Sequence, residues 1–297
     1  MSVYDEMRNY RNIIKRNFIY GFAILLLSLA VFKVFMLIHG PHFEFLSQAA
    51  YGVIEGKPHW IAYQNRLLGP MIVLIISKIG LAYPLSLKIF IFATLLIENI
   101  VLYTLLIRMN LPPRKSLLWV VLFSSAFIGL QHIFFYPWDC IDLIIFTMFS
   151  WGIFQSKSLC FFIPLFCIGI LNKESVFFIS LYIVIDAFRI SLDKFRVSFQ
   201  SGIKLAVGMV LSILGMIYTK LIRDYLFVSR DNGLDDNMHR QFGEHVYFMQ
   251  NVHDFFINNI KSLDIINSVF VVFSTAYMIY LVRRCGTDAS LKAMIIY

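Results

Sequence analysis

Apolar runs of about 17–25 residues recur along this chain from Phe18 to Leu281, and helices of that length match the hydrocarbon core of a bilayer. A transmembrane barrel would instead show strands of about ten residues with alternating polarity. Hydrophobic residues make up 59% of the chain and charged residues 15%, whereas soluble domains have about 45–50% and about 25%. We therefore predict an all-α fold, a polytopic transmembrane helical bundle of about eight to ten membrane helices.

The net charge of +8 is spread over several short loops. In polytopic proteins an excess of Lys and Arg marks the cytoplasmic loops, so we expect no nucleic-acid partner. The tail before the first apolar run carries Arg8, Arg11, Lys15 and Arg16, which predicts a cytoplasmic N-terminus. The four cysteines lack the paired spacing of zinc ligands, so the sequence indicates no structural metal site and no disulfide framework.

A polar and aromatic stretch follows the first run, and its apolar residues recur every three or four positions. These residues are Phe43, Leu46, Ala50, Val53 and Ile54. The pattern predicts an amphipathic helix in the first outer loop, lying on the membrane interface and ending at Glu55-Gly56-Lys57-Pro58.

The stretch from Leu67 to Ala82 is short, whereas the run from Leu85 to Ile107 is long enough to span a bilayer. If both crossed the membrane, the basic residues from Arg108 to Lys115 would lie outside, against the positive-inside bias. We therefore expect only one complete crossing here. The basic loop from Arg189 to Lys204 is then cytoplasmic, and the polar residues around 64–66, 136–142 and 172–175 share the outer face.

Residues 223–264 form a long polar segment that we expect to be an extracytoplasmic loop, either a lid or acceptor-binding element or a solvated loop. Its three histidines, His239, His245 and His253, lack tight ligand spacing. The chain ends in an apolar run from Leu291 to Tyr297, which is too short to span a membrane, so we expect either a truncated C-terminus or a missing last helix. No internal repeat or linker is evident, and we interpret residues 1–297 as one transmembrane domain.

The polar clusters adjoin membrane-length helices, where a charge costs a few kcal/mol unless it is paired or hydrated. Asp139 and Asp142 are three residues apart at the start of a predicted helix, where a carboxylate can cap backbone N–H groups. We favour that capping role for Asp142. For Asp139 we favour a functional role, because Trp138, Tyr136 and His132 lie close to it in sequence. Such a group could bind a sugar through aromatic rings and a carboxylate, or it could hold a divalent cation through oxygen ligands.

The remaining charged candidates each have a functional and a structural interpretation. Lys173 and Glu174 could bind a lipid phosphate and orient a second group, or they could lie at the interface with the lysine snorkelling. Arg66 could hold a phosphate with its planar fork or anchor the chain at the interface. Glu44 could be a functional carboxylate or an ordinary polar-face residue of the amphipathic helix.

The stretches Ala49-Ala50-Tyr51-Gly52-Val53-Ile54-Glu55-Gly56-Lys57 and Tyr63-Gln64-Asn65-Arg66-Leu67-Leu68-Gly69-Pro70 resemble the opening module of GT-C superfamily membrane glycosyltransferases. Tyr136-Pro137-Trp138-Asp139 and Asn172-Lys173-Glu174-Ser175 are similar to the second acidic loop of that superfamily and to a later polar turn. The resemblance covers residues 18–188.

The resemblance implies transfer of a sugar from a polyprenyl-phosphate donor to a glycan, lipid or protein acceptor on the outer face of a bacterial cytoplasmic (inner) membrane. It implies that Glu44 is the general base, with Asp139 as the other candidate. Arg66 and Lys173 would bind the lipid phosphate, and Glu174 would orient Lys173 or the acceptor. The other implied substrate-binding residues are Gln64, Tyr136, Trp138, His132 and Asp142.

Two functions from other classes stay open. One is a transporter or flippase of a lipid-linked saccharide, and the other is a non-catalytic membrane subunit. Some branches of the superfamily need Mg²⁺ or Mn²⁺ and others do not, so the sequence implies no essential metal but leaves a divalent cation open.

Overall fold

A computed structural model describes residues 3–59, 61–129, 136–191 and 196–228. These residues form helices, connecting turns and one short β-hairpin. The chain divides into two compact units. The first unit comprises Met1–Gln48 and Ile72–Met148, and the second comprises Ala49–Met71 and Phe149–Tyr297. Three helices begin in one unit and end in the other: α2 (Phe43–Ile54), α3 (Leu68–Ser77) and α6 (Pro137–Phe154). The His132 candidate and the segment from residue 229 onward lie outside the described residues.

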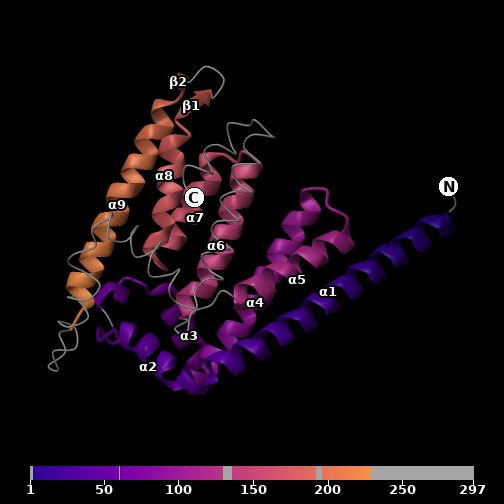
Figure 1. Ribbon diagram of the computed structural model, residues 1–297, viewed down its shortest axis with the longest axis horizontal. Coiled ribbons are helices and arrows are strands. Elements are labelled where there is room, and N and C mark those ends of the chain that lie inside the picture. Colours follow the sequence, from indigo (N-terminus) through magenta and orange to yellow (C-terminus); the bar gives the residue numbers. More distant parts are fainter. Residues whose placement is uncertain (1–2, 60, 130–135, 192–195, 229–297) are drawn as a thin grey trace, which may run out of the picture. The chain divides into compact units, whose positions relative to one another are not determined.

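The first unit is built around three helices that pack on one another, α1 (Val3–His39), α4 (Tyr83–Arg108) and α5 (Pro113–Gly129) (Figure 1). It also holds the 3₁₀ turn η1 (Gly40–His42), the first half of α2 (Phe43–Ile54), the end of α3 (Leu68–Ser77) and most of α6 (Pro137–Phe154).

Asn99 ties the three packed helices of the first unit together. Its Nδ2 donates to Ser28 Oγ on α1 at 2.9 Å, and its Oδ1 accepts from Ser124 Oγ on α5 at 2.8 Å. All three side chains are buried. Within lipid the hydrophobic effect does not drive helices together, because lipid tails are as apolar as the side chains. Interhelical hydrogen bonds of this kind therefore help to fix the packing of the helices.

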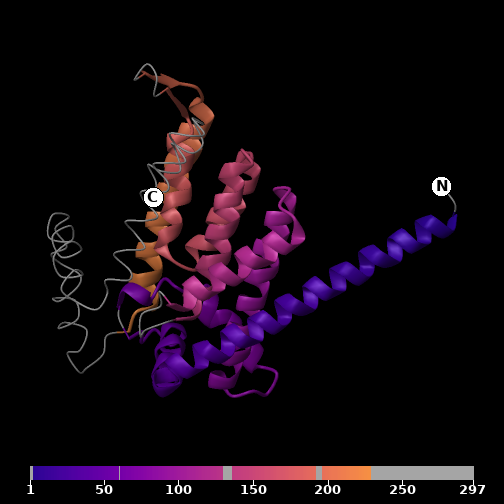
Figure 2. The same ribbon diagram turned by 45° about the vertical axis from the view of Figure 1, so that its right-hand side comes forward.

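The second unit contains three neighbouring helices, α7 (Leu159–Ile170), α8 (Phe177–Ile185) and α9 (Gly202–Leu226) (Figures 1 and 2). The 3₁₀ turn η3 (Glu174–Val176) joins α7 to α8. An antiparallel hairpin of β1 (Phe188–Ser191) and β2 (Arg196–Phe199) joins α8 to α9. The unit also includes the end of α2, the 3₁₀ turn η2 (Ile61–Tyr63) and the start of α3.

Glycine lets α8 and α9 approach closely. A Cβ atom added at Gly208 of α9 would lie 2.9 Å from the backbone nitrogen of Val184 and 3.0 Å from the backbone oxygen of Ser180. Ser212, one turn further along α9, donates to Ser180 Oγ at 2.9 Å. Small residues and hydroxyl hydrogen bonds at the same contact are typical of helix pairs in membranes.

Four stretches among the described residues are long and apolar enough to cross a membrane. They are Phe18–Ile54, Tyr83–Arg108, Pro137–Phe154 and Gly202–Leu226. The prediction of a helical membrane protein is confirmed at this level. The ten-residue α3 is about 15 Å long, half the thickness of a hydrocarbon core, whereas α4 has 26 residues. The single complete crossing expected between residues 67 and 107 stays a prediction.

Helix α2 forms where the apolar spacing predicts a helix, and Phe43, Leu46, Ala50 and Val53 are buried. It ends at Gly56, whose φ of +70° is the left-handed conformation that glycine adopts most easily. The amides of Gly56 and Lys57 donate to the carbonyls of Val53 and Gly52 at 3.4 and 2.7 Å, which is the Schellman pattern.

The hairpin is an addition to the all-α prediction. The segment from Arg189 to Lys204 was interpreted only as a basic loop, but Phe188 pairs with Phe199 in the ladder and their rings meet edge to face at 5.7 Å. The alternation of apolar and polar residues in Phe188-Arg189-Ile190-Ser191 is the period of a strand.

Candidate functional site

The polar segment between α2 and α3 is fixed at three points within the second unit. The carbonyl of Gly56 accepts from the backbone amide of Val228 at 2.5 Å, just beyond α9. The buried Gln64 donates from Nε2 to the carbonyl of Val53 at 2.8 Å. The amide of Leu68 donates to the carbonyl of Leu171, at the end of α7, at 2.9 Å. These bonds give Asn65 and Arg66 a defined place beside the turn that holds Glu174.

Arg66 and Glu174, which are 108 positions apart in sequence, form an ion pair in this place. Arg66 Nε donates to Glu174 Oε2 at 3.3 Å, and the Arg66 guanidinium carbon lies 4.6 Å from the centre of the Tyr63 ring. The side chains of Arg66 and Glu174 are 15% and 25% exposed. The pair is therefore partly accessible to solvent.

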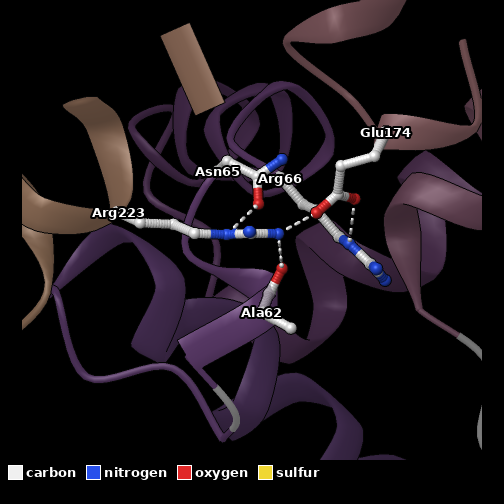
Figure 3. Close-up of polar contacts among 5 residues, drawn as sticks. All are labelled: Ala62, Asn65, Arg66, Glu174 and Arg223. Carbon is white, nitrogen blue, oxygen red and sulfur yellow. Dashed lines mark hydrogen bonds and ion pairs between the residues drawn. The ribbon is translucent and has the colours of Figure 1, made fainter. Parts of the chain in front are cut away.

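A second arginine, Arg223 in the last turn of α9, binds the other oxygen of the same carboxylate (Figure 3). Its Nε donates to Asn65 Oδ1 at 3.1 Å, and its Nη2 donates to the carbonyl of Ala62 at 3.2 Å. Figure 3 shows the two guanidinium groups reaching the Glu174 carboxylate from different sides. We call Arg66, Glu174 and Arg223 the arginine cluster. It holds two cations and one anion, so its formal charge is positive.

Sequence reasoning missed Arg223 except as the first residue of the long polar loop. A signal was available, because the buried positions Gly208, Leu211, Gly215 and Thr219 follow one face of α9. Arg223 lies four residues after Thr219 and continues that face. A cation near a helix C-terminus that points toward other protein elements is expected to have a partner.

The other predicted residues of the second unit lie near the arginine cluster in different roles. Gln64 is fully buried, and its amide supports the chain end of α2. Lys173 is the residue that precedes η3 and is partly exposed. Glu174 lies beside Lys173 in sequence, but among the described residues its ion-pair partners are the two arginines.

In the first unit, Asp139 makes the capping contact that was favoured for Asp142. Its Oδ2 accepts from the backbone amide of Tyr136 at 3.0 Å, as an acidic residue in the third position of a helix does when it reaches back to the N-cap. Asp142 is partly exposed one turn further into α6. The capping contact occupies one carboxylate oxygen of Asp139 and is compatible with a second role.

The aromatic candidates of the first unit pack inside the protein. Tyr136 and Trp138 are 5% and 1% exposed, and their rings stack with centroids 4.5 Å apart. Glu44 lies on the exposed side of α2, where its Oε1 is 3.5 Å from Gln48 Nε2. The predicted site residues thus divide between the two units. The first unit holds Glu44, Tyr136, Trp138, Asp139 and Asp142, and the second unit holds Gln64, Arg66, Lys173 and Glu174.

In the described part of the chain, no three His, Cys, Asp or Glu side chains gather in a way that could hold a metal ion. Asp139 and Asp142 belong to one helix but form no such group.

Comparison with known proteins gives no relative. The chain matches no protein-family model, no curated protein and no solved structure.

Proposed function

We propose that this chain is an integral membrane glycosyltransferase that moves a sugar from a polyprenyl-phosphate donor to a cell-envelope glycan, lipid or protein acceptor. The observation that carries the proposal is the arginine cluster, a positively charged and partly exposed group at the end of a membrane-length helix. Planar guanidinium groups suit phosphate oxygens because they donate parallel hydrogen bonds. The Glu174 carboxylate binds the guanidinium groups of both Arg66 and Arg223 and so offsets the repulsion between these two cations.

The position of the cluster along α9 agrees with a phosphate at headgroup depth. From Gly202 to Arg223 the helix rises about 31 Å, close to the thickness of a hydrocarbon core. At the other end of α9, Lys204 Nζ lies 2.5 Å from Asp186 Oδ2. That end also carries the basic hairpin, so the positive-inside bias assigns it to the cytoplasm. The arginine cluster then belongs to the extracytoplasmic face.

The proposed reaction is an inverting transfer. The acceptor hydroxyl gives its proton to a carboxylate while its oxygen forms a bond to the anomeric carbon. The bond from that carbon to the donor phosphate breaks, and the lipid phosphate leaves with the electron pair. Arg66 and Arg223 stabilise the negative charge on the departing phosphate, and Glu174 positions them. Asp139 and Glu44 remain the candidates for the base, and Lys173 is a further phosphate ligand.

The finer topology belongs to the same proposal. We place the N-terminus in the cytoplasm of a bacterial cell, α2 on the outer interface and about eight to ten helices in the membrane. The exposed positions of Glu44 and Gln48 and the buried apolar face of α2 suit an interfacial helix.

The test is a transfer assay with purified protein in lipid vesicles. Radiolabelled polyprenyl-phosphate hexoses and pentoses serve as donors, and an envelope extract serves as acceptor. We expect Arg66→Gln and Arg223→Gln each to lower the rate about 100-fold, as loss of one charge-stabilising donor does elsewhere. Asp139→Asn and Glu44→Gln distinguish the two candidate bases.

Lys220→Gln is the matched control, because Lys220 is an exposed cation one turn before Arg223 on the same helix. It should retain the wild-type rate. If folded wild-type protein transfers no sugar from any donor, the transferase proposal is wrong. Movement of the intact lipid-linked saccharide across the vesicle would then support a transporter, and neither activity would support a non-catalytic subunit.

A further inference from the structure

Glu98 is an ionisable residue in the middle of a helix that is long enough to cross a membrane. It lies 15 residues after the start of α4 and 10 before its end, or about 22 Å and 15 Å along the axis. Its side chain is only 2% exposed. Because a charge at this depth is costly, an intramembrane carboxyl group is expected to have a function.

The surroundings of Glu98 suit a neutral acid better than a carboxylate. Thr147 Oγ1 on α6 donates to Glu98 Oε1 at 2.6 Å. This is the one hydrogen bond that the Glu98 side chain makes with the described residues. Oε2 is buried without a partner among the described residues. A buried carboxylate normally needs a cation or several donors, and an uncompensated one costs several kcal/mol.

No cation in the described part of the first unit pairs with Glu98. The ionisable side chains that the structure describes on the elements packed against it are Tyr20, Lys33 and His39 on α1, Arg114 and Lys115 on α5, and Asp139, Cys140 and Asp142 on α6. His39 is buried at the end of α1, where its ring contacts that of Phe35. Lys33, Arg114 and Lys115 are exposed. A charged Glu98 would therefore lack the partner that usually keeps such a group in a membrane.

Helix packing alone does not explain the acid at this position. The adjacent Asn99 already links α4 to α1 and α5 through its two hydrogen bonds. The bond from Thr147 would be accepted equally well by the amide oxygen of a glutamine. What glutamate adds to this site is an exchangeable proton.

Polar side chains recur along α4 and α6 between Glu98 and the start of α6. Thr94 lies four residues before Glu98 on the same face of α4, and its hydroxyl contacts the Cys140 thiol. Cys140 lies seven residues before Thr147 on the same face of α6 and next to Asp139, whose side chain is partly exposed. We call Asp139, Cys140, Thr94, Thr147 and Glu98 the polar seam.

We propose that Glu98 is a proton-binding site inside the membrane and that its proton exchanges with water through the polar seam. The bound species is a proton. A proton needs no cavity, and it neutralises the carboxylate, so that the buried Oε2 no longer needs a cation beside it. The proposal does not depend on the transferase activity.

Infrared spectroscopy of the full chain in lipid vesicles at neutral pH tests the first part. A protonated carboxyl group has a C=O band separate from that of a carboxylate, and the band shifts when D replaces H. We expect such a band in wild-type protein and its loss in Glu98→Gln, which keeps the shape and the bond from Thr147. The same band in wild type and Glu98→Gln, or no band in either, would overturn the proposal.

A measurement without any substitution covers the case in which Glu98→Gln does not fold. Incorporating ¹³C-carboxyl glutamate should shift the band in the wild-type chain, whereas labelled aspartate should not. An unshifted band would assign the proton to another residue and refute the site.

Thr94→Val tests the exchange route, because valine keeps the volume but not the hydroxyl. We expect the band to persist and its shift after transfer to D₂O to become at least tenfold slower. Thr104→Val is the control, since Thr104 is an exposed residue on the same helix, and it should leave the rate unchanged. An unaltered rate in Thr94→Val would exclude the polar seam as the route.

Discussion

Arg223 connects three parts of the second unit through a single side chain. It binds Glu174 and Asn65, and Asn65 is fully buried. We expect Arg223→Gln to lower the stability by about 1–2 kcal/mol. This is the lower part of the range for leaving a buried acceptor unsatisfied, because the Arg223 side chain is itself 31% exposed. The measurement is the apparent thermal unfolding midpoint in detergent.

Lys220→Gln controls for the loss of a cation from α9. It is exposed, and such a surface substitution should change the stability by no more than about 0.5 kcal/mol. Equal shifts in the two variants would mean that the contacts of Arg223 add nothing to the stability of the unit.

Individual residues were predicted unequally well from the sequence. Arg66 and Glu174 were both selected because charge is costly near lipid, a property that a sequence reveals. Their pairing was not predicted, because contact between positions 66 and 174 depends on how α3 and α7 are held together by the Leu68–Leu171 hydrogen bond. The capping contact that Asp139 makes was assigned to Asp142 instead, because both residues suit the first turn of a helix.

At the scale of elements, the α8–α9 contact depends on the absence of a side chain at Gly208. A Cβ atom there would lie 2.6 Å from Val184 Cγ2 as well as close to two backbone atoms. We expect Gly208→Ala to lower the unfolding midpoint by the equivalent of about 1–3 kcal/mol, the usual cost of overpacking. A combined Gly208→Ala and Val184→Ala variant should recover only part of the loss, because the backbone contacts remain.

Gly21→Ala is the matched control in α1, where an added Cβ meets nothing within 4 Å. Alanine favours a helix over glycine by up to about 1 kcal/mol, so this variant should be neutral or slightly more stable. If Gly208→Ala behaves like Gly21→Ala, the close approach of α8 and α9 is incorrect.

Helices were easier to predict from this sequence than the hairpin. The run from Leu85 to Ile107 matches α4 (Tyr83–Arg108) to within two residues at each end, since the run is long and mostly apolar. Gly56 likewise marks the end of α2 by its backbone freedom. The strands were missed because the basic residues of the segment from Phe188 to Phe199 were interpreted for membrane sidedness, while its period-two alternation was left unused.

For the whole molecule, the decisive property is the side of the membrane on which each end of α9 lies. The helix has an Asp186–Lys204 pair at its first end and the arginine cluster at its last. A polyprenyl-phosphate donor used outside the cytoplasm requires the cluster to face outward. The positive-inside bias gives that orientation from the charge of the hairpin end alone.

Single cysteines at two exposed positions test this orientation. In a background with Cys140, Cys160, Cys167 and Cys285 replaced by alanine, one variant carries Gln200→Cys and the other Tyr225→Cys. Tyr225 is 86% exposed, and Gln200 is exposed just before α9. We expect a membrane-impermeant thiol reagent to label Tyr225→Cys in intact cells and Gln200→Cys only after permeabilisation. Labelling of both in intact cells would show that α9 does not cross the membrane. Labelling of Gln200→Cys alone would put the arginine cluster in the cytoplasm, where the proposed transfer could not take place.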